Sequence, residues 1–301
     1  ISTVSGTSAL HLSLHILGVT NNCEVFVPSI SFVATTNAIH HTGASPYFID
    51  CEPDDFGMNP FVLEKEIINN TLEKNGFLYN KKNGKKIAAV MVTHVFGQSC
   101  KIQEIKKICK KYNLPLVEDA AECIGSFYKN RHLGTFGDLG VLSFNGNKTI
   151  TTGGGGAILV KNNVLAEQIR HISTTAKLNH PWEYIHDEVG FNYRMSNLNA
   201  SLGCAQLERL ETLLENKRNL HQLYQGLFEK FDGIYLGEEK NNSKSNYWLQ
   251  YIYLEQDNYK FKDDILKLTI DTKINLRPLW SPLHKLKMNK KCSQSTMFET
   301  L

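Results

Sequence analysis

One lysine of this chain stands where an amine could act as a nucleophile. Lys148 lies between a short apolar run, Leu139–Phe144 (LGVLSF), and four consecutive glycines, Gly153–Gly156. That run and Ala157–Val160 (AILV) after the glycines have the β-branched and aromatic character of buried strands. We therefore expect Lys148 in a tight connection between two core strands, where the glycines let backbone approach a bound group closely.

A lysine in such a connection is a candidate for covalent cofactor chemistry. Its amine is nucleophilic near neutral pH when it is partly desolvated or placed near other cations. We interpret Lys148 as the reactive amine of a pyridoxal phosphate (PLP) enzyme, although an exposed lysine on a glycine-rich hairpin would have the same local sequence. A phosphate-binding P-loop is disfavoured, because five residues separate Gly140 from Gly146 and Asn147 precedes the lysine.

A second candidate feature is an anion site near the start of the chain. The polar stretch Ser2–Ser8 (STVSGTS) leads into a helical segment, Ala9–Leu17. Backbone N–H groups at a helix start, beside small hydroxyl residues and Gly6, can hold a phosphate. An ordinary N-cap formed by Ser5 or Thr7 explains the same residues.

The elements between these two features alternate in type. Strand-like Glu24–Val27, Pro46–Ile49, Ile87–Val92 and Leu114–Val117 alternate with helical Phe32–His41, Pro60–Asn69 and Ile102–Tyr112. Such alternation predicts an α/β fold with a mostly parallel sheet, whose ligands collect at the carboxyl ends of the strands. Asp119 follows one strand end, where a carboxylate could keep a pyridine nitrogen protonated. An N-cap for the next segment is the other interpretation of this acid.

The length of 301 residues allows one large domain and a smaller one. Leucines at helical spacing over Ser196–Lys217 predict a long helix at the end of the first. We expect a large PLP-binding domain at 1–217 and a smaller α+β domain at 218–301. Because Ile1 lies in what resembles a strand end and no closing element precedes Leu301, we expect truncation at both ends.

Composition argues against several classes of protein. The chain is 42% hydrophobic and 21% charged, and no apolar run is long enough to span a bilayer. A net charge of +3 is too small to indicate a nucleic-acid partner. Seven irregularly spaced cysteines, in a chain without a signal peptide, favour reduced thiols in the cytoplasm and argue against a metal site.

Taken together, these stretches resemble the sugar aminotransferases of the DegT/DnrJ/StrS family, which are fold type I PLP enzymes. Six motifs spread along nearly the whole chain carry the resemblance. They are S-G-T-x-A-L at Ser5–Leu10, P-x-x-[ST]-[FW] at Pro28–Phe32, V-x-V-H-x-[YF]-G at Val90–Gly97, E-D-A-A-[HEQ] at Glu118–Glu122, S-F-x-x-x-K at Ser143–Lys148 and G-x-N-Y-R-M at Gly190–Met195. One departure is the run Gly153–Gly156, where many family members have G-E-G-G.

The resemblance implies a role for each matching residue, and a homodimer with shared active sites. Gly6, Thr7, Ser8 and Ser143 would bind the cofactor phosphate, Lys148 would be the Schiff-base lysine, Asp119 would hold the pyridine nitrogen, Phe32 would stack on the ring, Glu122 would lie beside it, Asn192 would reach the phosphate of the neighbouring subunit, and Arg194 and His284 would contact substrate.

The implied reaction is amination of a nucleotide-linked 4-keto-6-deoxy sugar, with L-glutamate as donor. The S-F-N-G-N-K sequence and the lysine-rich segment before Ile87 most resemble those of the branch that aminates UDP-4-keto-6-deoxy-N-acetylglucosamine in bacillosamine or legionaminic acid pathways. Lys148 argues against the branch in which histidine replaces the lysine and the enzyme dehydrates the sugar. A GDP-linked 4-keto sugar, a 3-keto sugar, and a noncatalytic binding or regulatory protein on the same fold remain alternatives.

Overall fold

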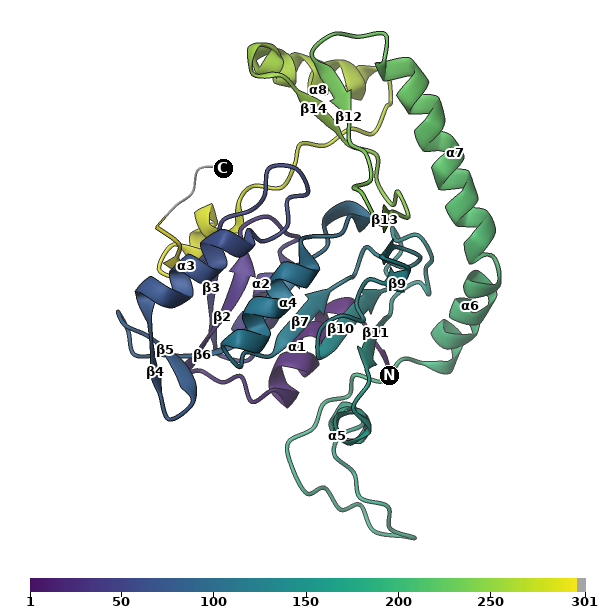
Figure 1. Ribbon diagram of the computed structural model, residues 1–301. Helices are drawn as coiled ribbons and strands as arrows, with labels where there is room; N and C mark the ends of the chain where they lie inside the picture. Colours follow the sequence, from purple (N-terminus) through teal and green to yellow (C-terminus); the bar gives the residue numbers. More distant parts are fainter. Residues whose placement is uncertain (297–301) are drawn as a thin grey trace.

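A mostly parallel sheet forms the centre of the computed structural model, which describes residues 1–296 (Figure 1). The pairs from β10 through β7, β6, β2 and β3 to β15 are parallel, whereas β11 pairs antiparallel with β1 and β10. The predicted α/β class is confirmed. The strand order is β1 (Ser2–Thr3), β11 (Gly156–Val160), β10 (Leu139–Ser143), β7 (Leu116–Asp119), β6 (Lys86–Thr93), β2 (Cys23–Pro28), β3 (Ser45–Ile49) and β15 (Ser293–Gln294).

Strand β2 shows why the sheet is covered on both faces. All of its residues are buried, and Val25 and Val27 enter one apolar core while Phe26 enters the other, as alternation along a strand requires. The sheet is thus the middle of three layers. Helices α1 (Gly6–Ile16), α2 (Ala34–His41) and α5 (Asn163–Ser173) supply the first core, and α3 (Pro60–Asn70) and α4 (Ile102–Lys111) supply the second.

The parallel strands bring distant chain segments to one edge of the sheet. Strand β6 ends at Thr93, β7 at Asp119 and β10 at Ser143. In the register of the sheet, Asp119 lies beside Thr93 on one side and Val141 on the other. Because carboxyl ends of parallel strands share an edge, the loops that follow them meet there.

Lys148 lies in the connection between β10 and β11, as expected. These two strands pair antiparallel, with Ser143 opposite Gly156. Of the four glycines after the lysine, Gly155 and Gly156 approach other protein atoms closely, and the expected approach to a bound group stays a prediction. A Cβ on Gly156 would lie 2.6 Å from the carbonyl carbon of Ser5, so only glycine lets this strand pass the start of α1.

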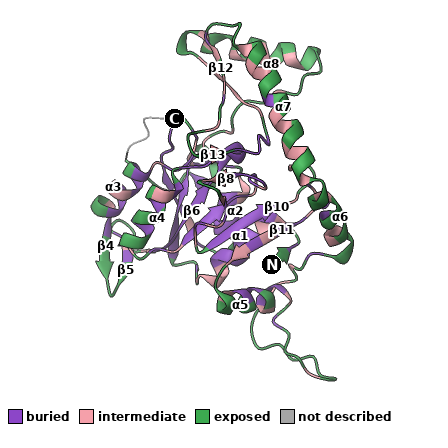
Figure 2. Cartoon of the chain, turned by 45° about the vertical axis from the view of Figure 1, so that its right-hand side comes forward, coloured by how far each residue is buried: buried purple, intermediate pink, exposed green. Residues whose placement is uncertain are grey.

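Two helices stand where one long helix was expected, so the predicted continuity over 196–217 is wrong. Helix α6 (Asn197–Glu208) closes at Arg209, whose N–H reaches carbonyls of its last turn, and α7 (Leu210–Phe228) begins there. No glycine or proline marks this break, so the helical spacing of the leucines could not reveal it. Figure 2 shows both helices largely exposed; their buried residues are Gly203 and His221.

The remaining elements pair with earlier strands at two places, once in a separate small sheet and once in the main sheet. Strand β12 (Ile234–Leu236) pairs with β14 (Ile252–Leu254), and α8 (Lys262–Asp271) follows. Strand β13 (Ser243–Lys244) pairs with β8 (Phe127–Tyr128), which also pairs with β9 (Arg131–His132), and β15 extends the main sheet beside β3. The boundary between 1–217 and 218–301 stays a prediction, and 297–301 lie outside the described residues.

The lysine-rich segment before Ile87 is a hairpin. Its strands, β4 (Thr71–Lys74) and β5 (Phe77–Asn80), pair with each other, and β5 touches the start of β6. Short 3₁₀ turns are η1 (Val95–Gly97), η2 (Gln256–Phe261), η3 (Leu283–Lys285) and η4 (Lys287–Asn289). Across residues 1–296, no helix combines the length and apolarity needed to cross a membrane.

Candidate active site

The amine of Lys148, in the connection after β10, contacts an acid and an aromatic ring. Its side chain is 11% exposed, and Nζ lies 3.4 Å from Oε1 of Glu122. The same Nζ lies 3.9 Å from the centre of the Trp248 ring, a cation–π distance. The exposed-hairpin interpretation of this lysine is therefore wrong, because the amine is enclosed by an acid and an aromatic face.

Glu122 is a buried acid with two different partners. Oε2 accepts a hydrogen bond of 2.7 Å from the backbone N–H of Phe96, while Oε1 faces Lys148. Burial raises the pKa of Glu122 to about 7, although the charge of Lys148 and the Phe96 bond oppose the rise. Phe96 adopts a left-handed backbone conformation with φ of 56° in η1. This carboxyl can therefore exchange a proton near neutral pH.

Asp119 ends β7 in a buried position, 5% exposed. Its Oδ2 accepts a hydrogen bond of 2.7 Å from the Thr35 hydroxyl on α2, and Oδ1 accepts one of 3.2 Å from the Ala121 N–H. Burial raises the pKa of Asp119, against the effects of these bonds and of the charge on Lys148. Each oxygen keeps acceptor capacity for one more donor, such as a pyridinium N–H.

A chain of hydroxyl groups supports Asp119 from within the sheet. Thr93 donates to Ser31 over 3.1 Å, and Ser31 lies 2.5 Å from Thr35. Because Thr35 gives its proton to Asp119, Ser31 must donate to Thr35 and accept from Thr93. All three hydroxyl residues are buried, so the chain holds the carboxylate in one orientation.

Glu118 points to the other side of β7, as alternation predicts. Its Oε2 accepts from His94 Nε2 over 2.9 Å, and Gly134 and Gly137 donate backbone N–H groups to its carboxylate. Burial alone would raise the pKa of Glu118, but the His94 bond and these N–H groups hold it below its usual range. His94 Nδ1 accepts from the Cys100 N–H, so Nε2 carries the proton. This pair anchors the loop around Asp119.

The expected phosphate site lies where α1 begins beside the end of β10. Ser5 caps the helix by accepting a hydrogen bond of 3.0 Å from the Ser8 N–H. A Cβ on Gly6 would lie 2.9 Å from Cβ of Ser143, so these segments approach as closely as glycine permits. The N-cap and the anion site are therefore compatible, because the backbone N–H groups of Gly6 and Thr7 are not used by intrahelical bonds.

Four of the predicted site residues make contacts with residues other than Lys148 and Asp119. Phe32 is 54% exposed, with its ring 6.3 Å from Trp280. His284 pairs through Nδ1 with the Ser29 hydroxyl at 2.8 Å, at the end of β2. Asn192 and Arg194 are exposed beyond α5, where their backbones bridge to Thr174 and Thr3.

Sequence reasoning missed three residues that complete this site. Thr35 lies within the predicted helix Phe32–His41, one turn after the expected stacking residue, and a polar side chain in a buried helix was the available signal. Trp248 lies 100 positions after the lysine, and Asn246, whose amide donates a hydrogen bond to the Glu122 carbonyl, lies two residues before it. Only the aromatic residues of that segment could have drawn attention to them.

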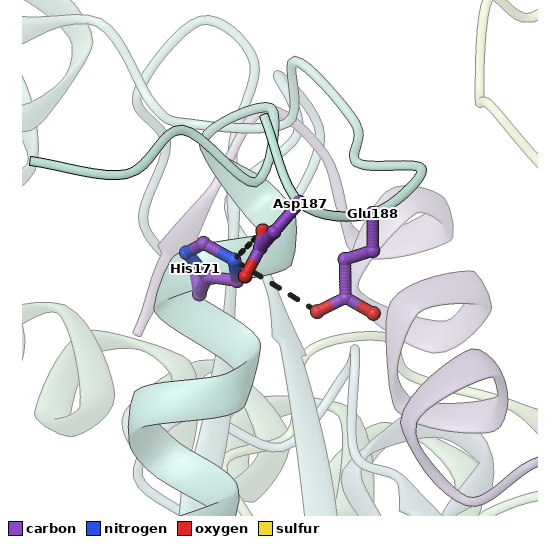
Figure 3. Close-up of side chains that lie close together, drawn as sticks. All are labelled: His171, Asp187 and Glu188. Carbon is purple, nitrogen blue, oxygen red and sulfur yellow. Dashed lines mark hydrogen bonds and ion pairs between the residues drawn. The ribbon is translucent and has the colours of Figure 1, made fainter. Parts of the chain in front are cut away.

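A separate cluster of possible ligand atoms lies near the surface (Figure 3). His171 of α5, Asp187 and Glu188 have ligand atoms within 4.8 Å of one another. Nε2 of His171 is 2.6 Å from Oδ1 of Asp187, a hydrogen bond that lowers the pKa of this acid. This distance is too short for two ligands of one tetrahedral zinc ion, which would lie roughly 3.3 Å apart. We interpret the cluster as a hydrogen-bonded pair between α5 and the following loop.

Known proteins resemble this chain over most of its length. A model of the DegT/DnrJ/EryC1/StrS aminotransferase family matches residues 1–300. EpsN of Bacillus subtilis (strain 168) is 40% identical over 280 residues, or 93% of this chain and 69% of EpsN. GDP-perosamine synthase of Vibrio cholerae is 34% identical over 298 residues, or 99% of this chain and 76% of that protein. The crystal structure of the aminotransferase TlmJ from Streptoalloteichus hindustanus matches with a TM-score of 0.86 at 26% identity, covering 100% of this chain and 76% of TlmJ.

Proposed function

The chain belongs to the DegT/DnrJ/EryC1/StrS aminotransferase family, and from that premise we propose that it aminates C4 of a nucleotide-linked 4-keto-6-deoxy sugar. The donor is L-glutamate and the acceptor is UDP-4-keto-6-deoxy-N-acetylglucosamine. Aminotransferases of this family use PLP, as the name of the relative EpsN states. The geometry that supports the proposal is the pairing of an enclosed amine, Lys148, with a buried carboxylate, Asp119, at one edge of the sheet.

The residues present suit the cofactor at four points: its ring nitrogen, its phosphate, its aldehyde carbon and one face of its ring. Asp119 keeps acceptor capacity after its bonds from Thr35 and Ala121, which suits a pyridinium N–H. The first N–H groups of α1 have no intrahelical acceptor and lie where Gly6 approaches Ser143, which suits a phosphate. Lys148 would hold the cofactor covalently, and the exposed ring of Phe32 would cover one face of it.

Pyridoxal phosphate supplies, when bound, a protonated ring that withdraws electrons from the carbon losing its proton. Asp119 keeps that ring nitrogen protonated. The Nζ of Lys148, once it is no longer bonded to the cofactor, takes a proton from the α-carbon of L-glutamate. It delivers that proton to the aldehyde carbon of the cofactor, which receives the amino group in this half of the reaction. In the second half of the reaction Nζ carries protons in the opposite direction, to C4 of the sugar. Glu122 lies within reach of the same amine.

We also propose that two copies of the chain share active sites. The segment that carries Asn192 is flanked by exposed apolar side chains: Trp182 is 78% exposed, Val189 79% and Leu198 86%. Apolar surface of this kind commonly marks a protein interface. Asn192 would then reach the phosphate bound in the partner copy, and Arg194 and His284 would contact the sugar nucleotide.

A GDP-linked 4-keto sugar is the second candidate acceptor. The Vibrio cholerae relative, 34% identical to this chain, is named GDP-perosamine synthase. We prefer the UDP-linked acceptor because of the sequence S-F-N-G-N-K that ends at Lys148 and the lysine-rich hairpin before Ile87.

The test uses purified protein loaded with PLP. L-glutamate should bleach its visible absorption, and adding the UDP-linked 4-keto sugar should restore the band and yield a 4-amino sugar detected by mass spectrometry. Lys148→Ala is expected to fold and to give no turnover. Faster restoration by a GDP-linked 4-keto sugar would favour the second acceptor. A folded protein that binds no PLP would contradict the proposal and favour a noncatalytic protein.

A further inference from the structure

Trp248 is the aromatic wall of the Lys148 amine, and it comes from a distant part of the chain. Its side chain is buried, and its indole N–H donates a hydrogen bond of 2.7 Å to the carbonyl of Asn147. The bond joins Trp248 to the residue directly before the lysine. Both the ring and the lysine backbone are thereby held in one relative position, which gives the 3.9 Å contact with Nζ.

The segment Ser245–Trp248 is fastened to the loops of the site. Asn246 donates hydrogen bonds of 2.8 and 3.0 Å from Nδ2 to the carbonyls of Glu122 and Ile124. Its Oδ1 accepts a hydrogen bond of 2.9 Å from the backbone N–H of Trp248. A Cβ on Gly97, which has a φ of 82°, would lie 2.0 Å from that Oδ1, so only glycine allows the approach. One buried amide thus aligns the acid and the ring that enclose the amine.

The pocket formed by Glu122 and Trp248 suits a free ammonium group. A carboxylate at 3.4 Å and a π face at 3.9 Å both attract a compact cation. Covalent attachment joins Nζ to the aldehyde carbon of the cofactor by a C=N bond and releases one water. The imine nitrogen is no longer the compact ammonium group that the indole face attracts, so this face serves the lysine when it is released.

Resting on the proposed function, we infer that Trp248 is a positioning residue that holds the released amine of Lys148 between the two halves of the reaction. The contact stabilises the state in which the lysine is not bonded to the cofactor. Its loss should therefore favour the bonded state. The sign is diagnostic, because removing a residue that only packs the site would weaken cofactor binding.

The test is a double-mutant cycle on the PLP affinity of the apoprotein. Trp248→Leu in the native background should bind PLP about 3- to 30-fold more tightly, since a desolvated cation–π contact is lost from the apo state only. Trp248→Phe keeps a weaker π face and should lie between. In the Lys148→Ala background the same substitutions should leave PLP affinity unchanged, because no amine is present to hold.

Trp280→Leu is the matched control, since Trp280 packs on Phe96 in the same aromatic cluster, with ring centres 5.2 Å apart. It should not tighten PLP binding. Weaker binding in Trp248→Leu, or an equal change in the Lys148→Ala background, overturns the inference while leaving the transamination proposal intact. Failure of the native protein to bind PLP would instead overturn the proposed function. If Trp248→Leu does not fold, Trp248→Phe gives the same comparison with a smaller expected change.

Discussion

Thr35 donates its hydroxyl proton to Oδ2 of Asp119 over 2.7 Å, from a helix 84 positions earlier in the chain. The bond fixes one oxygen of the carboxylate, and the Ala121 N–H fixes the other. The orientation of Asp119 toward a cofactor ring thus depends on α2 as well as on β7. The charge and the orientation of this carboxylate can therefore be altered separately, the charge by substituting Asp119 and the orientation by substituting Thr35.

Asp119→Asn should keep the fold and lose at least about 100-fold in kcat, because a neutral amide no longer keeps the ring nitrogen protonated. Thr35→Val keeps the charge and removes one bond, and should lose about 10-fold or less, as expected for a neutral hydrogen bond of about 1 kcal/mol. Steady-state kinetics of transamination measures both. Equal losses in the two variants would show that orientation, not charge, is what Asp119 provides.

Glu122 predicts a pH-dependent stability. Its folded-state pKa of about 7 lies above the ordinary value of 4.5, so the folded protein holds a proton that the unfolded chain releases. Stability contributed by this group is complete below pH 4.5 and is lost as the pH rises to about 7. The side chain in Glu122→Gln does not titrate. The free energy of unfolding of this variant, relative to that of the native apoprotein, should therefore rise by about 2–3 kcal/mol between pH 4.5 and pH 8.

Urea unfolding of both apoproteins at pH 5 and pH 8 checks this expectation. Glutamine can still accept the Phe96 N–H, so packing around the site is retained. A stability difference that is the same at both pH values would contradict the assignment of the titration to Glu122.

Two glycines of one run should behave differently. Gly156→Ala places a Cβ 2.6 Å from backbone of Ser5, whereas Gly154→Ala meets nothing within 4 Å and has no positive φ. We expect Gly156→Ala to lose about 1–3 kcal/mol of stability, because rigid backbone must move. Since the displaced backbone begins α1, PLP affinity should fall as well. Gly154→Ala should stay within about 0.5 kcal/mol of the native protein.

Thermal unfolding and PLP titration of the two variants give the comparison. Comparable effects of both substitutions would mean that the whole loop, and not the contact with Ser5, limits the site.

Shared active sites predict complementation between two inactive variants. Lys148→Ala lacks the reactive amine, and Asn192→Ala lacks the proposed phosphate contact in the partner. A mixed dimer has one site with both residues intact, so an equimolar, re-equilibrated mixture should recover about a quarter of native activity. The measurement is activity before and after exchange of subunits. If a mixture shown to contain mixed dimers recovers no activity, then either Asn192 and Lys148 serve the site of the same subunit, or Asn192 lies outside the active site.

Local sequence determined much of the fold and part of the site. The alternation of apolar strands with amphipathic helices predicted the parallel sheet, because burial on both faces needs nearly continuous apolar strands. The same pattern predicted Lys148 in the connection between β10 and β11, and Asp119 at a strand end. Short-range periodicity carries this information, since it depends on neighbours along the chain.

The tertiary structure alone decided the surroundings of these groups. Glu122 faces Lys148 from 26 positions away, and Trp248 contacts the same amine from a segment that follows α7 in the chain. Their partners are chosen by how the loops pack at the sheet edge, which no local pattern records. The break at Arg209 also escaped prediction, because a helix can end where chain direction changes without a glycine or proline. The sequence therefore predicted which groups are candidates for the chemistry, while the tertiary structure decided which residues surround them, because burial and orientation depend on residues distant in the chain.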